Sequence, residues 1–278
     1  MLSSSEKPPP PLAGLVELVW TVGESGSVPS VERVLPSGTT ELVFDLEDPE
    51  RAPLVYGPHS GPFEQRRSAR RSLVGIHFAP GGAATLLGVP ASEFENARVG
   101  LDSLGGWVAF ELGARLAEAP TARTRLRLVE SALLARFERI RPPHPAVAYA
   151  LAELAHDPAP RSIGAIAAGA GLSSRRFSEV FSAQVGLSPK LFARVRRFQR
   201  VLELAHARSK PDWMQLAIGC GYYDQAHLAR DFGEFAAISP NASLALRSED
   251  PNHLSLAPEG QFRPSASDCG RASLVAGE

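Results

Sequence analysis

Two stretches of the chain repeat one pattern: IAAGAGLSSRRFSEVF at residues 166–181 and LAIGCGYYDQAHLARDF at residues 216–232. In each copy an alanine precedes a glycine by four residues, and a phenylalanine is followed eight residues later by the proline of a Ser-Pro pair. The copies are offset by 50 residues before the glycine turn and by 51 after it, so the second turn is one residue longer. An internal repeat of this length indicates a duplicated structural unit.

Each copy is typical of a helix, a glycine turn and a second helix. The small alanine lets the two helices cross closely, and the glycine supplies the left-handed conformation that reverses the chain. Ser174 and Asp224 are the expected N-caps of the second helices. In a helix-turn-helix the second helix presents its N-terminal residues to the major groove of DNA. Two helical hairpins in an ordinary bundle are the alternative, but two copies in register favour the helix-turn-helix interpretation.

Residues 188–205, between the copies, predict one long helix with an apolar stripe. At 1.5 Å per residue it spans on the order of 27 Å. That length can set two recognition helices near successive major grooves, which are ~34 Å apart on one side of DNA. The arginines of this helix either contact phosphates or form a solvated face: Arg194, Arg196, Arg197 and Arg200.

The whole region 146–246 resembles the DNA-binding domain of AraC/XylS-type bacterial transcriptional regulators, which carries two helix-turn-helix motifs joined by one long helix. The residues that carry the resemblance are Ala167, Gly171, Phe181, Gly186-Leu187-Ser188-Pro189, Ala217, Gly221-Tyr222, Gln225, His227-Leu228, Phe232 and Ile238-Ser239-Pro240. Two residues depart from that pattern, Ala237 where glycine is usual and Leu244 where an aromatic is usual. A left-handed Ala237 would strain its helix end by on the order of 1 kcal/mol.

Side chains on the outer faces of the two recognition helices are the candidates for DNA contact. Arginine suits guanine, a glutamate accepts from cytosine N4, and glutamine suits adenine. The residues expected to contact bases are Arg175, Ser178, Glu179, Gln225 and Arg230. Those expected to contact the DNA backbone are Ser174, Arg176, Arg196, Arg197, Arg200, Asp224 and His227. For any single side chain, an exposed position without a DNA partner is the alternative.

The first half of the chain predicts a β-rich module followed by two helices. Short apolar runs bounded by glycine and proline occur at residues 15–22, 32–35, 40–44, 54–56 and 73–78. Helical spacing of apolar residues then predicts helices at 107–118 and 122–140. The fold class is therefore α+β. We divide the chain into a flexible leader (1–11), a regulatory domain (12–141), a double helix-turn-helix domain (142–247) and a flexible tail (248–278).

The N-terminal domain resembles an uncharacterised domain found ahead of some AraC-type regulators. The resembling segments are residues 35–38, 41–44, 57–59, 78–82 and 87–90, and the resemblance implies a regulatory domain without implying a ligand. The candidate effector pocket comprises Trp20, Glu41, Phe44, His59 and His77. The alternatives are that its aromatic residues only form core and that the two helices pair subunits or complete the domain.

The amino-acid composition limits the classes of protein to which the chain can belong. Of the 278 residues 44% are hydrophobic and 21% charged, which is ordinary for a globular protein. The net charge is −1, but residues 142–247 carry 12 Lys and Arg against 8 Asp and Glu, a net of +4 that favours a polyanionic partner. Two cysteines, Cys220 and Cys269, exclude a disulfide framework and a cysteine zinc cluster.

The sequence therefore predicts a cytoplasmic, sequence-specific transcriptional regulator and not an enzyme. Its expected partners are double-stranded DNA, a small-molecule effector, a second copy of the chain and RNA polymerase, with no membrane partner, no cofactor and no metal. Two alternatives stay open: a DNA binder that needs no effector, and a metal-dependent enzyme domain that uses His59, His77 and Glu41, since imidazole and carboxylate groups suit several transition metals.

Overall fold

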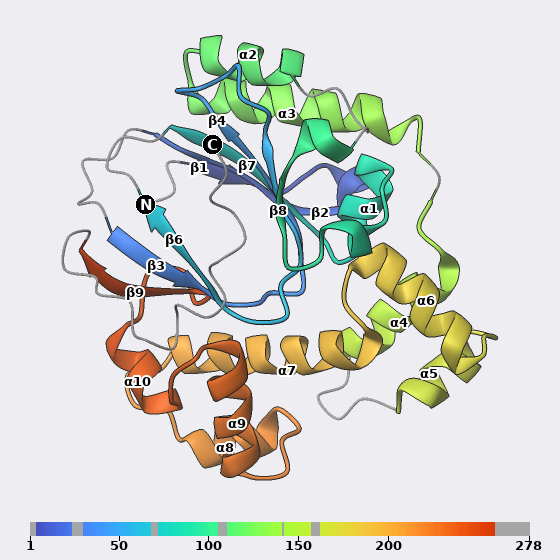
Figure 1. Cartoon of the computed structure of the whole chain (residues 1–278), viewed down its shortest axis with the longest axis vertical. Helices are drawn as coiled ribbons and strands as arrows, with labels where there is room; N and C mark the ends of the chain where they lie inside the picture. Colours follow the sequence, from blue (N-terminus) through green and yellow to red (C-terminus); the bar gives the residue numbers. More distant parts are fainter. Residues whose placement is uncertain are drawn as a thin grey trace.

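The computed structural model describes residues 4–23, 30–67, 72–104, 110–140, 142–156 and 162–258. A β-rich N-terminal part is followed by a helical C-terminal part that lies beneath it in Figure 1, which confirms the α+β class. In the part of the chain that the structure describes, no helix is both long and apolar enough to span a membrane.

The larger sheet has six antiparallel strands in the order β1-β2-β7-β4-β5-β8. Their bounds are β1 Ser4–Glu6, β2 Val16–Val22, β4 Glu41–Asp45, β5 Leu54–Tyr56, β7 Leu73–Phe78 and β8 Arg98–Gly100. One face carries buried side chains such as Phe44, Ile76 and Phe78. Helices α2 (Phe110–Glu118) and α3 (Ala122–Phe137) lie above the sheet in Figure 1, and Leu126 and Val129 of α3 belong to the same core.

The smaller sheet joins one strand, which follows the helical part, to two strands of the N-terminal part. Its order is β6 (Phe63–Arg67), β3 (Ser30–Val34) and β9 (His253–Pro258), with both pairings antiparallel. The expectation of a flexible tail is therefore wrong for His253–Pro258, because these residues complete a backbone ladder with β3. The expected flexible leader is wrong for Ser4–Glu6, which pair with β2. Residues 259–278 lie outside the described part.

Short elements complete the N-terminal part. They are α1 (Gly82–Leu87) and the 3-10 helices η1 (Pro10–Leu12), η2 (Ala91–Phe94) and η3 (Leu101–Leu104). The sequence pattern did not predict α1, β1, β6, β8 or β9. It did predict β7 with the observed bounds and the positions of β2, β3, β4 and β5 to within two residues.

The helical part contains the two predicted helix-turn-helix units. Its helices are α4 Pro145–His156, α5 Ile163–Gly169, α6 Ser174–Val185, α7 Pro189–His206, α8 Trp213–Gly219, α9 Gln225–Phe235 and α10 Pro240–Ala245. Helices α5 and α6 form the first unit, α8 and α9 the second, and the single helix α7 joins them. Figure 1 shows α7 running beneath the N-terminal part with one unit near each end.

The two turns have the backbone geometry that the repeat predicts. Gly171 and Gly221 have φ of 72° and 80°, and the alanines four residues before them are buried. One cap differs from the prediction: Ser173, not Ser174, caps α6, because the Ser173 Oγ accepts from the Arg176 N–H. Asp224 caps α9 as expected.

The second turn is one residue longer than the first, and the additional residue is Tyr223. It directly precedes the Asp224 cap and is 90% exposed. Ala237 has φ of 53°. This is the left-handed conformation that a glycine would adopt without strain.

Candidate nucleic-acid interface

Helix α6 turns a charged face outward. Phe177 and Phe181 are buried on its inner side, whereas the Arg175 side chain is 91% exposed. Glu179 accepts from Arg175 Nε at 3.1 Å and from Arg176 Nη1 at 3.4 Å. Ion pairs this exposed contribute little free energy, so the pairing with Glu179 does not fix either arginine.

Helix α9 is exposed at its N-terminal end and along one face. Gln225 and Arg230 are exposed, whereas Leu228 and Phe232 are buried. His227 is half-buried; its ring packs edge-on against Tyr222, and its Nε2 accepts from Arg197 Nη2 at 3.2 Å. His227 is therefore held by the protein itself.

A buried carboxylate fastens α9 to α7. The side chain of Asp231 is only 2% exposed, and its two oxygens accept from Arg194 at 2.7 Å and from Arg197 at 3.3 Å. Arg194 also bonds Glu234, and this hydrogen bond is the largest cause of the raised pKa of Arg194. These contacts fix the orientation of the second recognition helix on the linker helix.

Arg197 completes this network. Its guanidinium lies over the ring of Tyr222, 4.1 Å from the centroid, and its side chain is 20% exposed. Burial raises the pKa of the Tyr222 hydroxyl, so the ring stays neutral beside Asp231. The sequence pattern did not predict that Asp231, Tyr222 and Arg194 position α9. A charged residue beside the core residue Phe232 was the available signal.

The other expected DNA-backbone residues lie at varied exposures. Arg200 is largely exposed and 3.5 Å from Glu203, and Arg196 is half-buried on α7. Ser178 donates its hydroxyl to the Ser174 carbonyl, within the first turns of α6.

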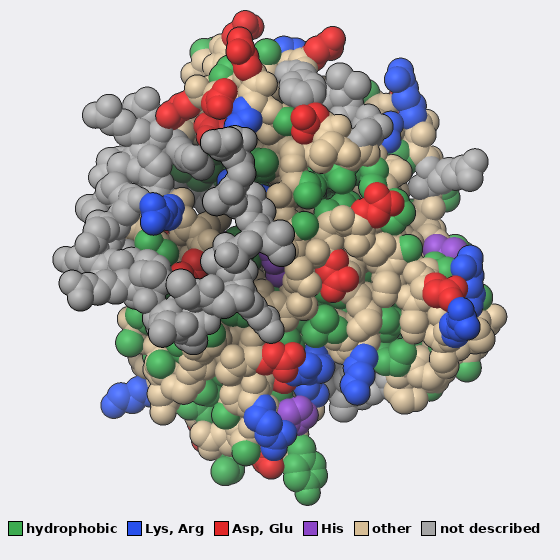
Figure 2. Space-filling view, viewed as in Figure 1, with side chains coloured by type: hydrophobic (Ala, Val, Ile, Leu, Met, Phe, Trp, Pro, Cys, Tyr) green, Lys and Arg blue, Asp and Glu red, His purple; other side chains and the backbone are tan. Residues whose placement is uncertain are grey.

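Figure 2 shows Lys and Arg side chains over α6 and over α9 in one view, so both recognition helices present basic groups on the same face of the molecule.

Three of the five candidate effector residues form a cluster, and the other two do not join it. Glu41 Oε1 accepts from Trp20 Nε1 and lies 3.2 Å from His77 Nδ1, so three of the five lie together on the larger sheet. Phe44 lies in the core on the other face of that sheet, and His59 packs against Phe63 at 4.2 Å between ring centroids. Burial lowers the pKa of His59 to about 4.

The Glu41–His77 pair is electrostatically coupled. Burial by itself raises the pKa of Glu41, but the hydrogen bond and charge of His77 outweigh it and lower that pKa. Burial likewise lowers the pKa of His77, and the hydrogen bond to Glu41 outweighs it, so that pKa is raised. Among the described residues, no three His, Cys, Asp or Glu side chains are grouped to hold a metal ion.

Comparisons with known proteins find two families. Residues 5–100 match a domain of unknown function, DUF6597, and residues 166–245 match a helix-turn-helix domain. No curated protein matches the chain.

Several solved structures resemble the chain at low sequence identity. An AraC-type transcriptional regulator from Chromobacterium violaceum is 24% identical over 38% of this chain and 94% of its own, with a TM-score of 0.34. ToxT from Vibrio cholerae is 9% identical over 82% of this chain and 95% of its own, with a TM-score of 0.39. ToxT bound to an unsaturated fatty acid is 9% identical over 86% and 92%, with a TM-score of 0.37.

Proposed function

We propose that this chain, whose residues 166–245 form an AraC-type helix-turn-helix domain, is a sequence-specific transcriptional regulator that docks α6 and α9 in adjacent major grooves. The observation that carries the proposal is the pair of outward-facing recognition helices on one face of the molecule, joined by the single helix α7. A regulator of this kind works in the cytoplasm.

The base contacts of the proposal come from the exposed faces. Arg175 suits guanine, Glu179 suits cytosine and Gln225 suits adenine, with Ser178 and Arg230 beside them. Phosphates would be bound by Arg176, Arg196 and Arg200 and by the backbone amides at the starts of α6 and α9, near Ser174 and Asp224. Arg197 and His227 would act by holding α9 in place.

The N-terminal domain would regulate this activity. The cluster of Trp20, Glu41 and His77 lies near His253 of the smaller sheet, since the charges of Glu41 and His253 affect each other's pKa. A polar cluster between two sheets can orient a small effector, and the face of α2 and α3 that points away from the sheet can pair two subunits. RNA polymerase is the last of the proposed partners.

Arg175→Ala tests the base-contact assignment. Operator sequences are first selected from a random DNA library with the full chain, and dissociation constants are then measured on the selected site and its single-base variants. We expect Arg175→Ala to cost about 1–3 kcal/mol on the selected site and to relax preference at one base pair. Arg51→Ala, which changes an exposed arginine between β4 and β5, is the matched control and should leave binding unchanged.

Two results would count against the proposal. An equal loss of affinity on every DNA sequence would make Arg175 a phosphate contact only. A library that yields no enriched sequence would reject sequence-specific binding altogether.

A further inference from the structure

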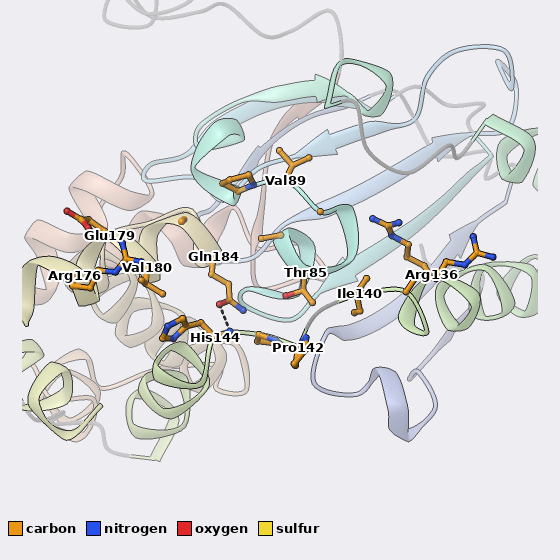
Figure 3. A pocket seen from close by; sticks show the side chains of 16 residues that line it. Thr85, Val89, Arg136, Ile140, Pro142, His144, Arg176, Glu179, Val180 and Gln184 are labelled. Carbon is orange, nitrogen blue, oxygen red and sulfur yellow. Dashed lines mark hydrogen bonds and ion pairs between the residues drawn. The ribbon is translucent and has the colours of Figure 1, made fainter. Parts of the chain in front are cut away.

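A cleft of about 730 Å³ lies between the N-terminal domain and the first recognition helix. Its walls are α1 and the turn after it, the end of α3, the segment 142–144, and α6 (Figure 3). Small-molecule sites have volumes of roughly 300–1,000 Å³. A hydrogen bond from the His144 N–H to Gln184 Oε1 at 3.0 Å ties the connecting segment to α6 beside the cleft.

The lining has arginines at both ends, with apolar and polar side chains between them. Figure 3 shows Arg136 of α3 at one end and Arg176 of α6 at the other, with Val89, Ile140 and Val180 also lining the space. Among the residues that the structure describes, three arginines line the cleft, Arg136, Arg139 and Arg176, against one carboxylate, that of Glu179. The chemistry of the lining therefore favours an anion with an apolar body.

The positive charge is most available at the α3 end. Glu179 already pairs with Arg176 at the α6 end. Arg136 is held in place by the bond from its Nε to the Leu86 carbonyl at 2.8 Å, which leaves its terminal nitrogens for a ligand. Arg139 is exposed, and its guanidinium has no partner among the residues that the structure describes. An anionic group placed here gains charge-assisted hydrogen bonds.

We propose that this cleft binds a small molecule with an apolar body and one carboxylate or similar anionic group. The anion lies against Arg136 and Arg139, and the apolar body lies against Val89, Ile140 and Val180. Such a ligand touches α3 and α6 together, so it links the N-terminal domain directly to a recognition helix. This site is separate from the cluster of Trp20, Glu41 and His77.

Because the ligand contacts both α3 and α6, it can regulate DNA binding. This regulatory effect rests on the proposed function, whereas binding of the ligand does not. A ligand that favours one placement of α6 changes the affinity for DNA, and DNA changes the affinity for the ligand by the same factor. The ligand also binds in the absence of DNA, so the site can be tested without DNA.

The experiment uses the full chain and a matched pair of probes, 4-phenylbutanoate and its neutral amide, titrated by calorimetry up to millimolar concentration. We expect saturable binding of the acid and binding of the amide weaker by about tenfold. Arg139→Gln should weaken the acid by about five- to tenfold and leave the amide unchanged. Arg115→Gln, on an exposed position of α2 outside the cleft, should change neither.

The outcomes separate this proposal from the proposed function. Equal binding of acid and amide, equal effects of Arg139→Gln and Arg115→Gln, or no saturable binding of the acid would overturn the site. Acid binding that depends on Arg139, in a chain that enriches no DNA sequence, would uphold the site and reject the regulator. Acid binding that leaves the affinity for a selected operator unchanged would overturn the coupling.

Discussion

Asp231 is the residue on which the placement of the second recognition helix depends. Two arginines of α7 donate to it, and its carboxylate is almost wholly buried. Glu234, one turn along α9, bonds the same Arg194, but its side chain is 50% exposed. Asp231 and Glu234 therefore share the partner Arg194 but differ in how far their carboxylates are buried.

Asp231→Ala should therefore lower the free energy of unfolding by about 2–4 kcal/mol, because two partly buried arginines lose their common acceptor. Glu234→Ala should cost only about 0–1 kcal/mol, since water screens an exposed ion pair. Urea unfolding followed by circular dichroism measures both. Equal costs for the two variants would show that the buried carboxylate does not hold α9 on α7.

At the scale of elements, β9 fastens the end of the helix-turn-helix domain to the N-terminal domain. His253 of β9 lies 3.0 Å from Glu32 of β3, and Leu254 is buried in the core of the helical part. Burial lowers the pKa of His253, but the hydrogen bond to Glu32 outweighs it, so the pKa is raised above 6.5. The pair is therefore strongest when His253 is protonated.

The stability that this pair contributes depends on pH. Because the folded-state pKa of His253 is raised, the contribution is fully present below the unfolded-state value of about 6.5 and is lost as the pH rises through the raised value. We expect the free energy of unfolding to fall over that window, and to fall less in His253→Gln, which keeps a hydrogen-bond donor but does not titrate. His77 contributes in the same direction and remains in the variant. Identical pH profiles for the two chains would exclude a contribution from the His253–Glu32 pair.

The elements that the sequence predicted are those whose signals are local. Gly171 and Gly221, the buried alanines before them and the cap at Asp224 are all set by a few neighbouring residues, so both helix-turn-helix units could be located. The paired strands β3 and β9 carry Glu32 and His253, whose side chains hydrogen-bond although they lie 221 positions apart in the sequence. No local pattern reports such a partner, and the polar residues 248–252 before β9 indicated a tail.

The candidate site was predicted only in part for a similar reason. Exposure of Arg175 and Gln225 follows from helical spacing against the buried phenylalanines. The fixation of Arg197 by Asp231 and Tyr222 depends on how α9 packs on α7, and the cleft beside α6 depends on how the two domains meet. Both the position of Arg197 and the shape of the cleft are decided by packing between elements that are distant in the sequence.

At the scale of the whole molecule, α7 is shared by the two domains. Gln199 is buried on α7, and its Nε2 donates to the Pro36 carbonyl of the N-terminal domain at 2.6 Å. Gly38, with φ of 76°, approaches the ring of Phe192 so closely that a Cβ there would lie 3.0 Å from it. Arg33 donates to the Ala236 carbonyl at the end of α9. The N-terminal domain thus contacts both the linker helix and the second helix-turn-helix unit.

These contacts predict that the two domains unfold together. Gln199→Leu should cost about 1–3 kcal/mol, because the Pro36 carbonyl is left buried without a donor. The same change at Gln215, which is exposed on α8, should stay within about 0.5 kcal/mol. Urea unfolding is followed in chains that keep only Trp20 of β2 or only Trp213 of α8. With α7 common to both cores, the two probes should report one midpoint, and Gln199→Leu should shift both equally. A midpoint that moves for one tryptophan alone would mean that the domains fold independently and that α7 belongs to the helix-turn-helix domain only.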